Sequence, residues 1–317
     1  MAQMLVTGGA GFIGSNLVEK LVTDGHQVRV IDNLSTGRLS NLADLLDQIT
    51  MIEGDFRDAG QISEAARDVE VIFHQGALPS VPRSIEDPLL SHDVNVTGTL
   101  QVLLAARDLG VRRVVLASSS SVYGDQDPNI PKVETMTPKP ISPYAVNKLA
   151  DEYYAQVFYQ VYGLETVCLR YFNVFGPRQD PNSAYAAVIP KFIDLYVQDQ
   201  PPTIHGDGEQ TRDFSYIANV VAANFLAASR PADQVAGQVF NVAQGGRTSL
   251  NELATQLKRL TGATVDAVHG PPREGDIKHS WADIDKAIEK LAYDPEISFS
   301  DGLEQTVAWY RETAQQA

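Results

Sequence analysis

The chain has 317 residues, of which 44% are hydrophobic, so it can bury a large core and is long enough for one large domain and a smaller one. Its 25 basic and 40 acidic side chains give a net charge of −15, which argues against general binding to nucleic acids or anionic membranes. No apolar stretch approaches the roughly 18 residues of a membrane span, and the N-terminus lacks a secretory leader pattern, so we expect a cytoplasmic protein.

Short apolar runs alternate with amphipathic stretches over the first 170 residues, which is typical of a parallel sheet with helices on both faces. We therefore expect an α/β fold built on a doubly wound parallel sheet. The predicted strands are residues 4–7, 27–32, 50–53, 69–74, 113–118 and 165–170. Helices are predicted at 94–109, ended by Gly110, and at 143–162, capped by Ser142 and ended by Gly163.

The regular alternation ends after residue 172. Residues 173–183 and 199–211 are rich in Pro, Gly, Asn and Asp, so we expect loops there. Further elements are predicted as helices at 188–198, 217–229 and 249–260 and as a strand at 238–242. This pattern indicates a smaller C-terminal portion packed over the sheet, with the chain crossing back at least once.

A glycine-rich turn follows the first predicted strand. Gly8, Gly11 and Gly14 fit the spacing Gly-x-x-Gly-x-x-Gly, and Gly9, Gly11 and Gly14 fit Gly-x-Gly-x-x-Gly. Missing side chains allow a tight strand-to-helix turn and the close approach of a pyrophosphate to the helix N-terminus. A turn without a ligand is the alternative, but the strand before it and the helix after it favour a dinucleotide.

Asp32 ends the next predicted strand, 18 residues after Gly14. A carboxylate there can accept hydrogen bonds from the adenosine ribose and would repel a 2′-phosphate, which favours NAD over NADP. Arg38 could hold such a phosphate, but a solvated loop charge is the simpler interpretation. Asp55-Phe56 and residues 75–77 follow two further strands, at the edge of the sheet where the ligand is expected.

Tyr144 and Lys148 lie at positions i and i+4 of a predicted helix and therefore share a face. A surface tyrosine over a lysine stem is the common alternative. A serine-rich segment, residues 118–124, ends the fifth predicted strand. Together with the glycine turn, these residues predict a proton-transfer pair beside a nicotinamide, because a neighbouring ammonium stabilises a phenolate.

With these motifs the chain resembles the extended short-chain dehydrogenase/reductase family, and within it the nucleotide-sugar 4-epimerases, over nearly its whole length. The resemblance implies a Rossmann-type NAD-binding domain at residues 1–172, with returning segments around 212–243. It implies that residues 173–317 mainly form a smaller α/β substrate domain for a nucleotide sugar. The expected contacts of the NAD cofactor are Gly8, Gly11, Phe12, Ile13, Gly14, Asp32, Asn33, Ser35, Gly37, Asp55, Phe56, Gln75, Ala77, Asn95, Tyr144, Lys148 and Tyr171.

The resemblance also implies catalytic roles. Tyr144 matches the acid/base that takes the proton of the sugar O4, Lys148 matches the lysine that binds the nicotinamide ribose, and Ser119 matches the residue that holds the reacting hydroxyl. Ser120 and Ser121 are further candidates, because four serines stand in a row. The related 4,6-dehydratases carry Asp-Glu and the decarboxylases carry Glu at these two positions, so serines there favour epimerisation at C4 through a 4-keto sugar.

The same resemblance makes a UDP-hexose the expected substrate. Asn173, Arg212 and Arg273 match residues that bind the diphosphate, and Asp276 matches one that binds the ribose. Ser280 matches a gate beside the sugar C2 substituent, where a small residue leaves room for an N-acetyl group. We therefore expect UDP-GlcNAc and UDP-GalNAc, with UDP-Glc and UDP-Gal as further substrates. The expected substrate contacts are Ser80, Arg83, Ser119, Ser121, Asn173, Ala187, Val188, His205, Arg212, Arg273, Asp276 and Ser280.

Alternatives to this interpretation are a UDP-glucuronate 4-epimerase, another NAD(P)-dependent nucleotide-sugar oxidoreductase and a non-catalytic dinucleotide sensor. The histidines show no spacing typical of metal ligands, so we expect no metal. The family commonly pairs through two helices, here near 94–109 and 142–162, so we expect a homodimer. The apolar faces of those helices could equally belong to the core.

Overall fold

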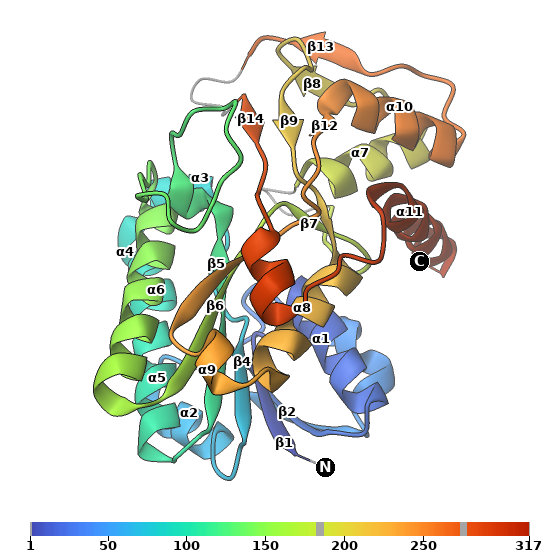
Figure 1. Ribbon diagram of the computed structural model, residues 1–317. Helices are drawn as coiled ribbons and strands as arrows, with labels where there is room; N and C mark the ends of the chain where they lie inside the picture. Colours follow the sequence, from blue (N-terminus) through green and yellow to red (C-terminus); the bar gives the residue numbers. More distant parts are fainter. Residues whose placement is uncertain (1, 182–186, 273–277, 317) are drawn as a thin grey trace.

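The structure is a computed structural model that describes residues 2–181, 187–272 and 278–316. Its centre is a seven-stranded parallel sheet with the order β11-β6-β5-β4-β1-β2-β3 (Figure 1). The direction of winding reverses between β1 and β4, so the expected Rossmann-type, doubly wound sheet is confirmed. The strands are β1 (Gln3–Thr7), β2 (Gln27–Asp32), β3 (Ile49–Glu53), β4 (Val71–His74), β5 (Arg113–Ser119), β6 (Glu165–Tyr171) and β11 (Gln238–Val242).

Helices cover both faces of this sheet, and alternate strand residues feed two separate cores. Val6 packs on one side with Leu17 of α1, whereas its neighbour Leu5 packs on the other side with Leu103 of α5. Both faces of each central strand are thereby buried, as expected for a parallel sheet. The covering helices are α1 (Phe12–Thr23) and α8 (Ile217–Ser229) on the first side, and α2 (Ala59–Ala65), α5 (Gly98–Asp108) and α6 (Pro143–Tyr162) on the second.

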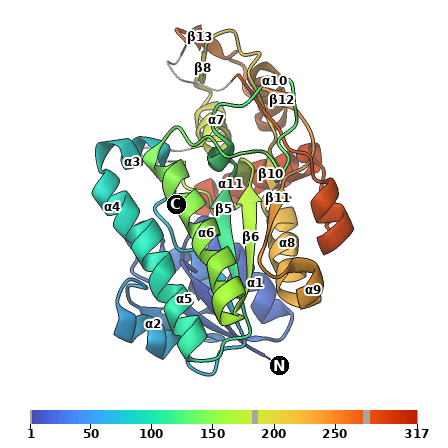
Figure 2. The same ribbon diagram turned by 60° about the vertical axis from the view of Figure 1, so that its left-hand side comes forward.

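The connection from β4 to β5 is more helical than predicted. It contains α3 (Val81–Glu86), α4 (Pro88–His92) and a π-helical turn (Asp93–Thr97) that runs directly into α5. The helix predicted at 94–109 therefore begins earlier and opens with the π turn. Figure 2 shows α4, α5 and α6 side by side, and residues of α4 and of α5 contact α6.

A smaller part of the molecule begins where the chain leaves the carboxyl ends of β6 and β11. It lies at the top of Figure 1, above the large sheet. Three small sheets, β10-β7, β12-β9-β14 and β13-β8, organise it. Its elements are β7 (Val174–Phe175), α7 (Val188–Val197), β8 (Thr203–His205), β9 (Thr211–Arg212), β10 (Ser215–Tyr216), β12 (Thr248–Ser249), α10 (Leu250–Thr261), β13 (Val268–Gly270), β14 (His279–Ser280) and α11 (Phe299–Gln316).

The two segments predicted as loops are only partly loops. Residues 173–183 contain β7, and residues 199–211 contain β8 and the start of β9. These strands of two or three residues depend on pairing with distant segments, such as β8 with β13, which local composition does not reveal. Other short or late elements lie outside the predicted ones, namely α2, α3, α4, α9 (Ala232–Val235), a π-helical turn (Ala287–Leu291) and α11.

Candidate active site

The glycine turn connects β1 to α1 with almost no space to spare. Gly8 has φ +68°, and a Cβ atom on Gly14 would lie 2.2 Å from the Gly8 carbonyl oxygen. Gly11 is the N-cap of α1 and offers no side chain to the first N–H groups of the helix. These N–H groups and the positive end of the helix dipole suit an anionic pyrophosphate. Phe12 and Ile13 form the first turn and are half-buried.

Asp32 ends β2 and is fixed beside this turn. One carboxylate oxygen accepts a hydrogen bond from the backbone N–H of Ala10 and the other from that of Leu34, each at 2.9 Å. Burial raises the pKa of Asp32, and these two bonds only partly oppose the rise. A Cβ atom on Gly37 would lie 2.9 Å from Asp32 Oδ2, so a residue without a side chain lets this loop pack against the carboxylate. Arg38 forms an ion pair with Asp180 at 2.5 Å.

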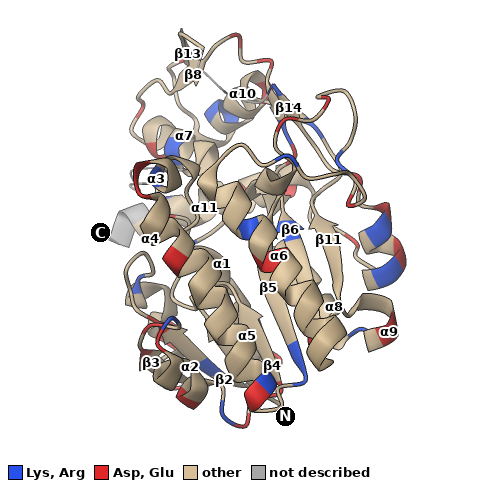
Figure 3. Ribbon diagram, turned by 90° about the vertical axis from the view of Figure 1, so that its left-hand side faces the viewer, with Lys and Arg blue, Asp and Glu red and all other residues tan. Residues whose placement is uncertain are grey.

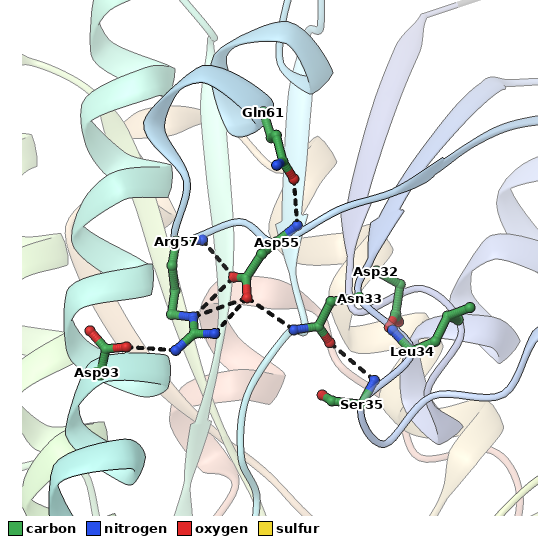
Figure 4. A network of polar contacts seen from close by, with 8 residues as sticks. All are labelled: Asp32, Asn33, Leu34, Ser35, Asp55, Arg57, Gln61 and Asp93. Atoms are coloured by element: carbon green, nitrogen blue, oxygen red, sulfur yellow. Dashed lines mark hydrogen bonds and ion pairs between the residues drawn. The ribbon is translucent and has the colours of Figure 1, made fainter.

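A polar network links the carboxyl ends of β2 and β3 (Figure 4). The Asn33 side-chain amide donates to Asp55 Oδ2 at 3.0 Å, and the backbone N–H of Ser35 donates to Asn33 Oδ1 at 3.1 Å. Arg57 binds both Asp55 oxygens and Asp93, which lowers the pKa of Asp55 against the opposing effect of burial. Three of the expected cofactor contacts, Asn33, Ser35 and Asp55, thus belong to one preorganised rim.

The segment after β4 carries further expected contacts. The Gln75 side chain is 3.2 Å from the Tyr171 hydroxyl, which also bonds Asn224 of α8, and burial raises the pKa of Tyr171 to about 12. Ala77 is half-buried. The residue after it, Leu78, donates its backbone N–H to Asn95 Oδ1 at 2.8 Å.

Phe56 follows β3 and lies at the same edge of the sheet. It is buried and packs edge-on against the His74 ring, with ring centroids 5.3 Å apart. Cβ atoms on Gly76 or Gly98 would lie 2.6 Å and 2.3 Å from its ring, so these two glycines make room for it. Phe56 therefore holds the segment after β4 in place by packing.

The first turns of α6 bring Tyr144 and Lys148 together. Ser142 caps the helix by accepting from the Ala145 N–H at 3.2 Å, and the Tyr144 N–H donates to Ser84 Oγ of α3 at 3.0 Å. Lys148 is buried one helical turn later, and its Nζ is 3.2 Å from Asp151 Oδ2. Burial lowers the pKa of Lys148, but the negative charges of Asp151 and of an ionised Tyr144 outweigh that effect and raise it.

The serine-rich segment lies against this helix. Ser120 and Ser121 belong to a 3₁₀ turn (Ser120–Tyr123) that contacts α6. Ser119 Oγ accepts from the Ser121 N–H at 3.2 Å, and Ser121 Oγ is buried without a hydrogen-bond partner among the described residues. Ser118 instead donates to Glu152 at 2.5 Å and is part of the scaffold.

A buried ion pair supports α6 from behind. Both Glu152 oxygens bind the Arg170 guanidinium, at 2.8 and 2.7 Å, and Arg170 lies 4.6 Å from the centre of the Tyr123 ring. The Tyr123 hydroxyl donates to Asn241 of β11 at 2.6 Å. These supporting residues, and also His74 and Asp151, were not predicted from the sequence. The sequence hints at them only by placing charged residues within otherwise apolar runs.

On the substrate side, Arg212 and Ser280 are direct neighbours. They are register partners in the parallel pair β9–β14, and the Asp213 N–H donates to the Ser280 carbonyl at 3.0 Å. Asn173 follows β6 with φ +34°, and its side-chain amide donates to the Asp213 carbonyl at 2.9 Å. The Asp213 carboxylate in turn accepts from the N–H groups of Gln244, Gly245 and Ala282. The ends of β6, β9, β11 and β14 are thereby tied together.

The other expected substrate contacts are spread over two regions. Ser80 caps α3 by accepting from the N–H of Arg83, whose side chain is half-buried, and Ala187 and Val188 begin α7. Arg273 and Asp276 lie outside the described residues. A surface hollow of about 640 Å³ in the smaller part is lined by His205, Gly206, Asp207, Gln210, His269, Gly270, Pro272 and Lys278.

The residues that the structure describes include neither a metal-binding cluster nor a membrane-spanning helix. No group of three or more His, Cys, Asp or Glu side chains within residues 2–181, 187–272 and 278–316 has the arrangement of a metal site. In the same part of the chain, none of the helices has the length and apolar character needed to span a bilayer. Cys168 lies in β6 within the core, and burial raises the pKa of its thiol well above the ordinary value.

Comparison with known proteins gives a consistent result. Residues 4–243 match the NAD dependent epimerase/dehydratase family. A UDP-glucose 4-epimerase from Mycolicibacterium smegmatis is 41% identical, over 98% of this chain and 99% of the relative. Two solved structures are similar with a TM-score of 0.93 each, covering 98% of this chain and 99% of theirs. They are the UDP-glucose 4-epimerase of Thermotoga maritima with UDP-glucose (38% identity) and the UDP-N-acetylglucosamine 4-epimerase of Methanobrevibacter ruminantium with UDP-N-acetylmuramic acid (41%).

The glycine turn fits the cofactor of that family on its own geometry, because only residues without side chains can form so tight a turn, and the first N–H groups of α1 have no side-chain cap where a pyrophosphate would approach. A fixed carboxylate, Asp32, stands beside it for the ribose. This chain is a member of the NAD-dependent epimerase/dehydratase family, and its cofactor is NAD.

Proposed function

We propose that this protein is a UDP-sugar 4-epimerase, which inverts C4 of a UDP-hexose through a transient 4-keto sugar. The observation that carries the proposal is the pair Tyr144 and Lys148 on α6, with the serine turn packed against the helix. The serine turn follows β5 and the glycine turn follows β1, so both lie at the carboxyl edge of the parallel sheet.

In the proposed reaction, Tyr144 accepts the proton of the sugar O4 while Ser119 holds that hydroxyl by a hydrogen bond. Bound NAD supplies the hydride acceptor at C4. The Lys148 ammonium stabilises the phenolate, and burial of the lysine strengthens this interaction because the surroundings are poorly polarisable. Tyr144 returns the proton when the keto sugar is reduced from its other face, so C4 is inverted and no cofactor is consumed.

Elimination would need an additional acid close to the sugar to protonate the leaving hydroxide. Ser120 and Ser121 occupy the positions where such an acid is expected, and neither can ionise in the physiological range. A neutral hydroxyl can orient the substrate but cannot donate a proton to a leaving hydroxide as readily as a carboxylic acid. The residues present therefore support epimerisation.

For the sugar, we infer a preference for UDP-GlcNAc and UDP-GalNAc, with UDP-Glc and UDP-Gal as weaker substrates. The support is Ser280, a small, half-buried side chain that pairs in register with Arg212. A guanidinium suits a diphosphate, so a sugar attached to that diphosphate would have its substituents near Ser280.

Equilibration of each UDP-hexose with purified enzyme tests the proposal. We expect NMR to show both C4 epimers of the N-acetylated pair, with NAD retained and none converted to free NADH. Turnover of the non-acetylated pair alone would refute the substrate preference. Turnover of UDP-glucuronate, stoichiometric oxidation of NAD(P)H, or tight dinucleotide binding without turnover would each replace the proposal by one of its alternatives.

Tyr144→Phe removes the proposed acid/base and little else. Without general acid–base catalysis we expect kcat to fall about 10²- to 10⁴-fold, while bound NAD and the melting temperature stay close to those of the parent. Tyr162→Phe is the matched control, because Tyr162 lies at the far end of the same helix and is exposed. Equal activity of the Tyr144→Phe variant and the parent would contradict the proposed mechanism.

We also propose that two copies associate through the outer faces of α4 and α6. Leu89 on α4 and Val146, Tyr153 and Val161 on α6 are exposed. The three charged residues of α6, Lys148, Asp151 and Glu152, are all buried, and α4 and α6 are mostly tan in Figure 3. Exposed apolar side chains gathered on two helices that contact each other are typical of protein–protein interfaces.

A further inference from the structure

Two adjacent carboxylates on α6 are buried, and each has its own cation. Glu152 uses both oxygens for Arg170. Asp151 is left with Lys148, whose Nζ is 3.2 Å from Oδ2, and both side chains are only 3% exposed. Asp151 Oδ1 is buried without a hydrogen-bond partner among the described residues. The lysine of the proposed proton-transfer pair therefore has a counter-ion of its own.

Stability does not explain this pair well. Taking two charges out of water costs more than their attraction returns unless the remaining hydrogen-bonding sites are filled. Here Asp151 Oδ1 has no hydrogen bond within the described part of the chain, because the nearby Thr99 hydroxyl donates to the Asn95 carbonyl at 2.5 Å instead. The pair therefore resembles a group kept for its effect on chemistry rather than for its contribution to folding. Such a group beside an active-site lysine fits a role in setting the position and charge of that lysine.

We propose that Asp151 is a positioning residue for the proton-transfer centre: its carboxylate holds the Lys148 ammonium in place and keeps it charged. The inference rests on the proposed function. Its physical reason is that a fully buried lysine without a counter-ion loses its proton readily, and a neutral amine cannot stabilise the Tyr144 phenolate. The i,i+3 spacing on α6 fixes the two side chains on one face of the helix.

The other ionisable groups near Lys148 and Asp151 add no net charge at neutral pH, so each of these two residues is the other's main charged neighbour. His74 of β4 is neutral above acidic pH, because burial and the Lys148 charge lower its pKa to about 3. Cys168 of β6 has a pKa raised far above its ordinary value by burial. Arg170 of β6 and Glu152 of α6 neutralise each other. Burial, opposed by Lys148, raises the pKa of Asp151 to about 6, so the carboxylate is ionised at neutral pH.

Asp151→Asn tests the proposal, because it keeps the shape of the side chain and removes its charge. Without the carboxylate, Lys148 loses its proton at a lower pH and an ionised Tyr144 no longer faces a nearby negative charge. Both effects move the pH profile of kcat in the same direction. We expect the bell-shaped profile to shift to lower pH by about one unit or more, with the loss of activity greatest at alkaline pH.

Asp108→Asn is the matched control, since Asp108 pairs with Arg107 on the surface and its removal changes the net charge equally. We expect its pH profile to equal that of the parent. Asp151→Glu should retain the parental profile even if kcat falls. An Asp151→Asn profile that coincides with the parent, or a uniform loss at every pH, would overturn the proposal. An inactive parent would instead refute the proposed function.

A second measurement covers the case in which Asp151→Asn folds poorly, and it needs no activity. Lys148→Met removes the cation, so at alkaline pH (about pH 9) the buried carboxylate is either unpaired or must take up a proton, and both cost stability. Adding Asp151→Asn to that variant should then raise the melting temperature of the cofactor-free protein. If the added substitution leaves the melting temperature unchanged or lowers it, Asp151 does not depend on Lys148 and the proposal fails.

Discussion

At the scale of single residues, His74 shows how burial selects one protonation state. Its ring nitrogens lie 2.7 Å from the Thr7 hydroxyl and 2.9 Å from the Thr99 hydroxyl. A neutral imidazole satisfies both, by donating from one nitrogen and accepting at the other. Burial, and then the charge of Lys148, lower the pKa of His74 to about 3 from an ordinary value of 6.5. The folded protein therefore holds a neutral ring at the end of β4, whereas the same histidine in the unfolded chain binds a proton in mild acid.

This difference predicts a specific loss of stability in acid. Between pH 6.5 and pH 3 the unfolded chain binds a proton at His74 and the folded protein does not, so each unit of acidification lowers the free energy of unfolding by about 1.4 kcal/mol. His74→Gln removes that contribution. From pH 7.5 to pH 5 we expect the parent to lose roughly 2 kcal/mol more than the variant in urea unfolding. Equal losses would mean that His74 is protonated in the folded protein.

Individual residues also show what local sequence can and cannot predict about the site. Tyr144 and Lys148 share a helix, so their i,i+4 spacing alone predicts their common face. The position of Asp32 beside the glycine turn is likewise predictable from its spacing along the sequence, 18 residues after Gly14. His74 and Arg170 acquire their roles only through partners on other elements, Thr99 and Glu152, and no local pattern encodes those contacts.

At the scale of elements, strong local signals predicted the structure best. The strands at 27–32 and 238–242 and the helix at 217–229 have the predicted bounds, and Ser249 caps α10 through a capping box with Glu252. The short strands of the smaller part depend on long-range pairing instead. The π turn before α5 was not predicted for a related reason, because its shape depends on packing against α4 and α6.

The turn between β1 and α1 should tolerate no added side chain at Gly14. Gly14→Ala would place a Cβ atom 2.2 Å from the Gly8 carbonyl oxygen, so the turn must shift and its N–H groups no longer meet a pyrophosphate correctly. We expect the purified variant to carry far less NAD and to melt at a lower temperature. Gly246→Ala is the control, because its Cβ would have no neighbour within 4 Å. Parental NAD content in Gly14→Ala would refute this account of the cradle.

At the scale of the whole molecule, charge is distributed unevenly. The chain carries a net charge of −15, yet α6 exposes none of its charged residues. Like-charged copies repel one another in general, and an uncharged, apolar face is where that repulsion is weakest and burial most favourable. This contrast is the physical reason to expect self-association through α4 and α6 and not through another surface.

Val157→Glu tests that expectation, because Val157 is 47% exposed on the outer face of α6. A carboxylate buried in a symmetric interface would meet its own copy, so we expect light scattering to give twice the chain mass for the parent and the mass of one chain for the variant. Leu46→Glu, at an exposed leucine before β3, should leave the mass of the parent unchanged. A monomeric parent would refute the association.

The carboxylate of Asp213 has a mechanical consequence. It collects N–H groups from the segment after β11, which belongs to the large sheet, and from the segment after β14, which belongs to the smaller part. Any hinge rotation between the two parts would have to break these charge-assisted bonds together, at a cost of about 1.5–3 kcal/mol each. These bonds resist a change in the relative orientation of the two parts, so we expect both parts to keep the arrangement seen here when a ligand binds between residues of either.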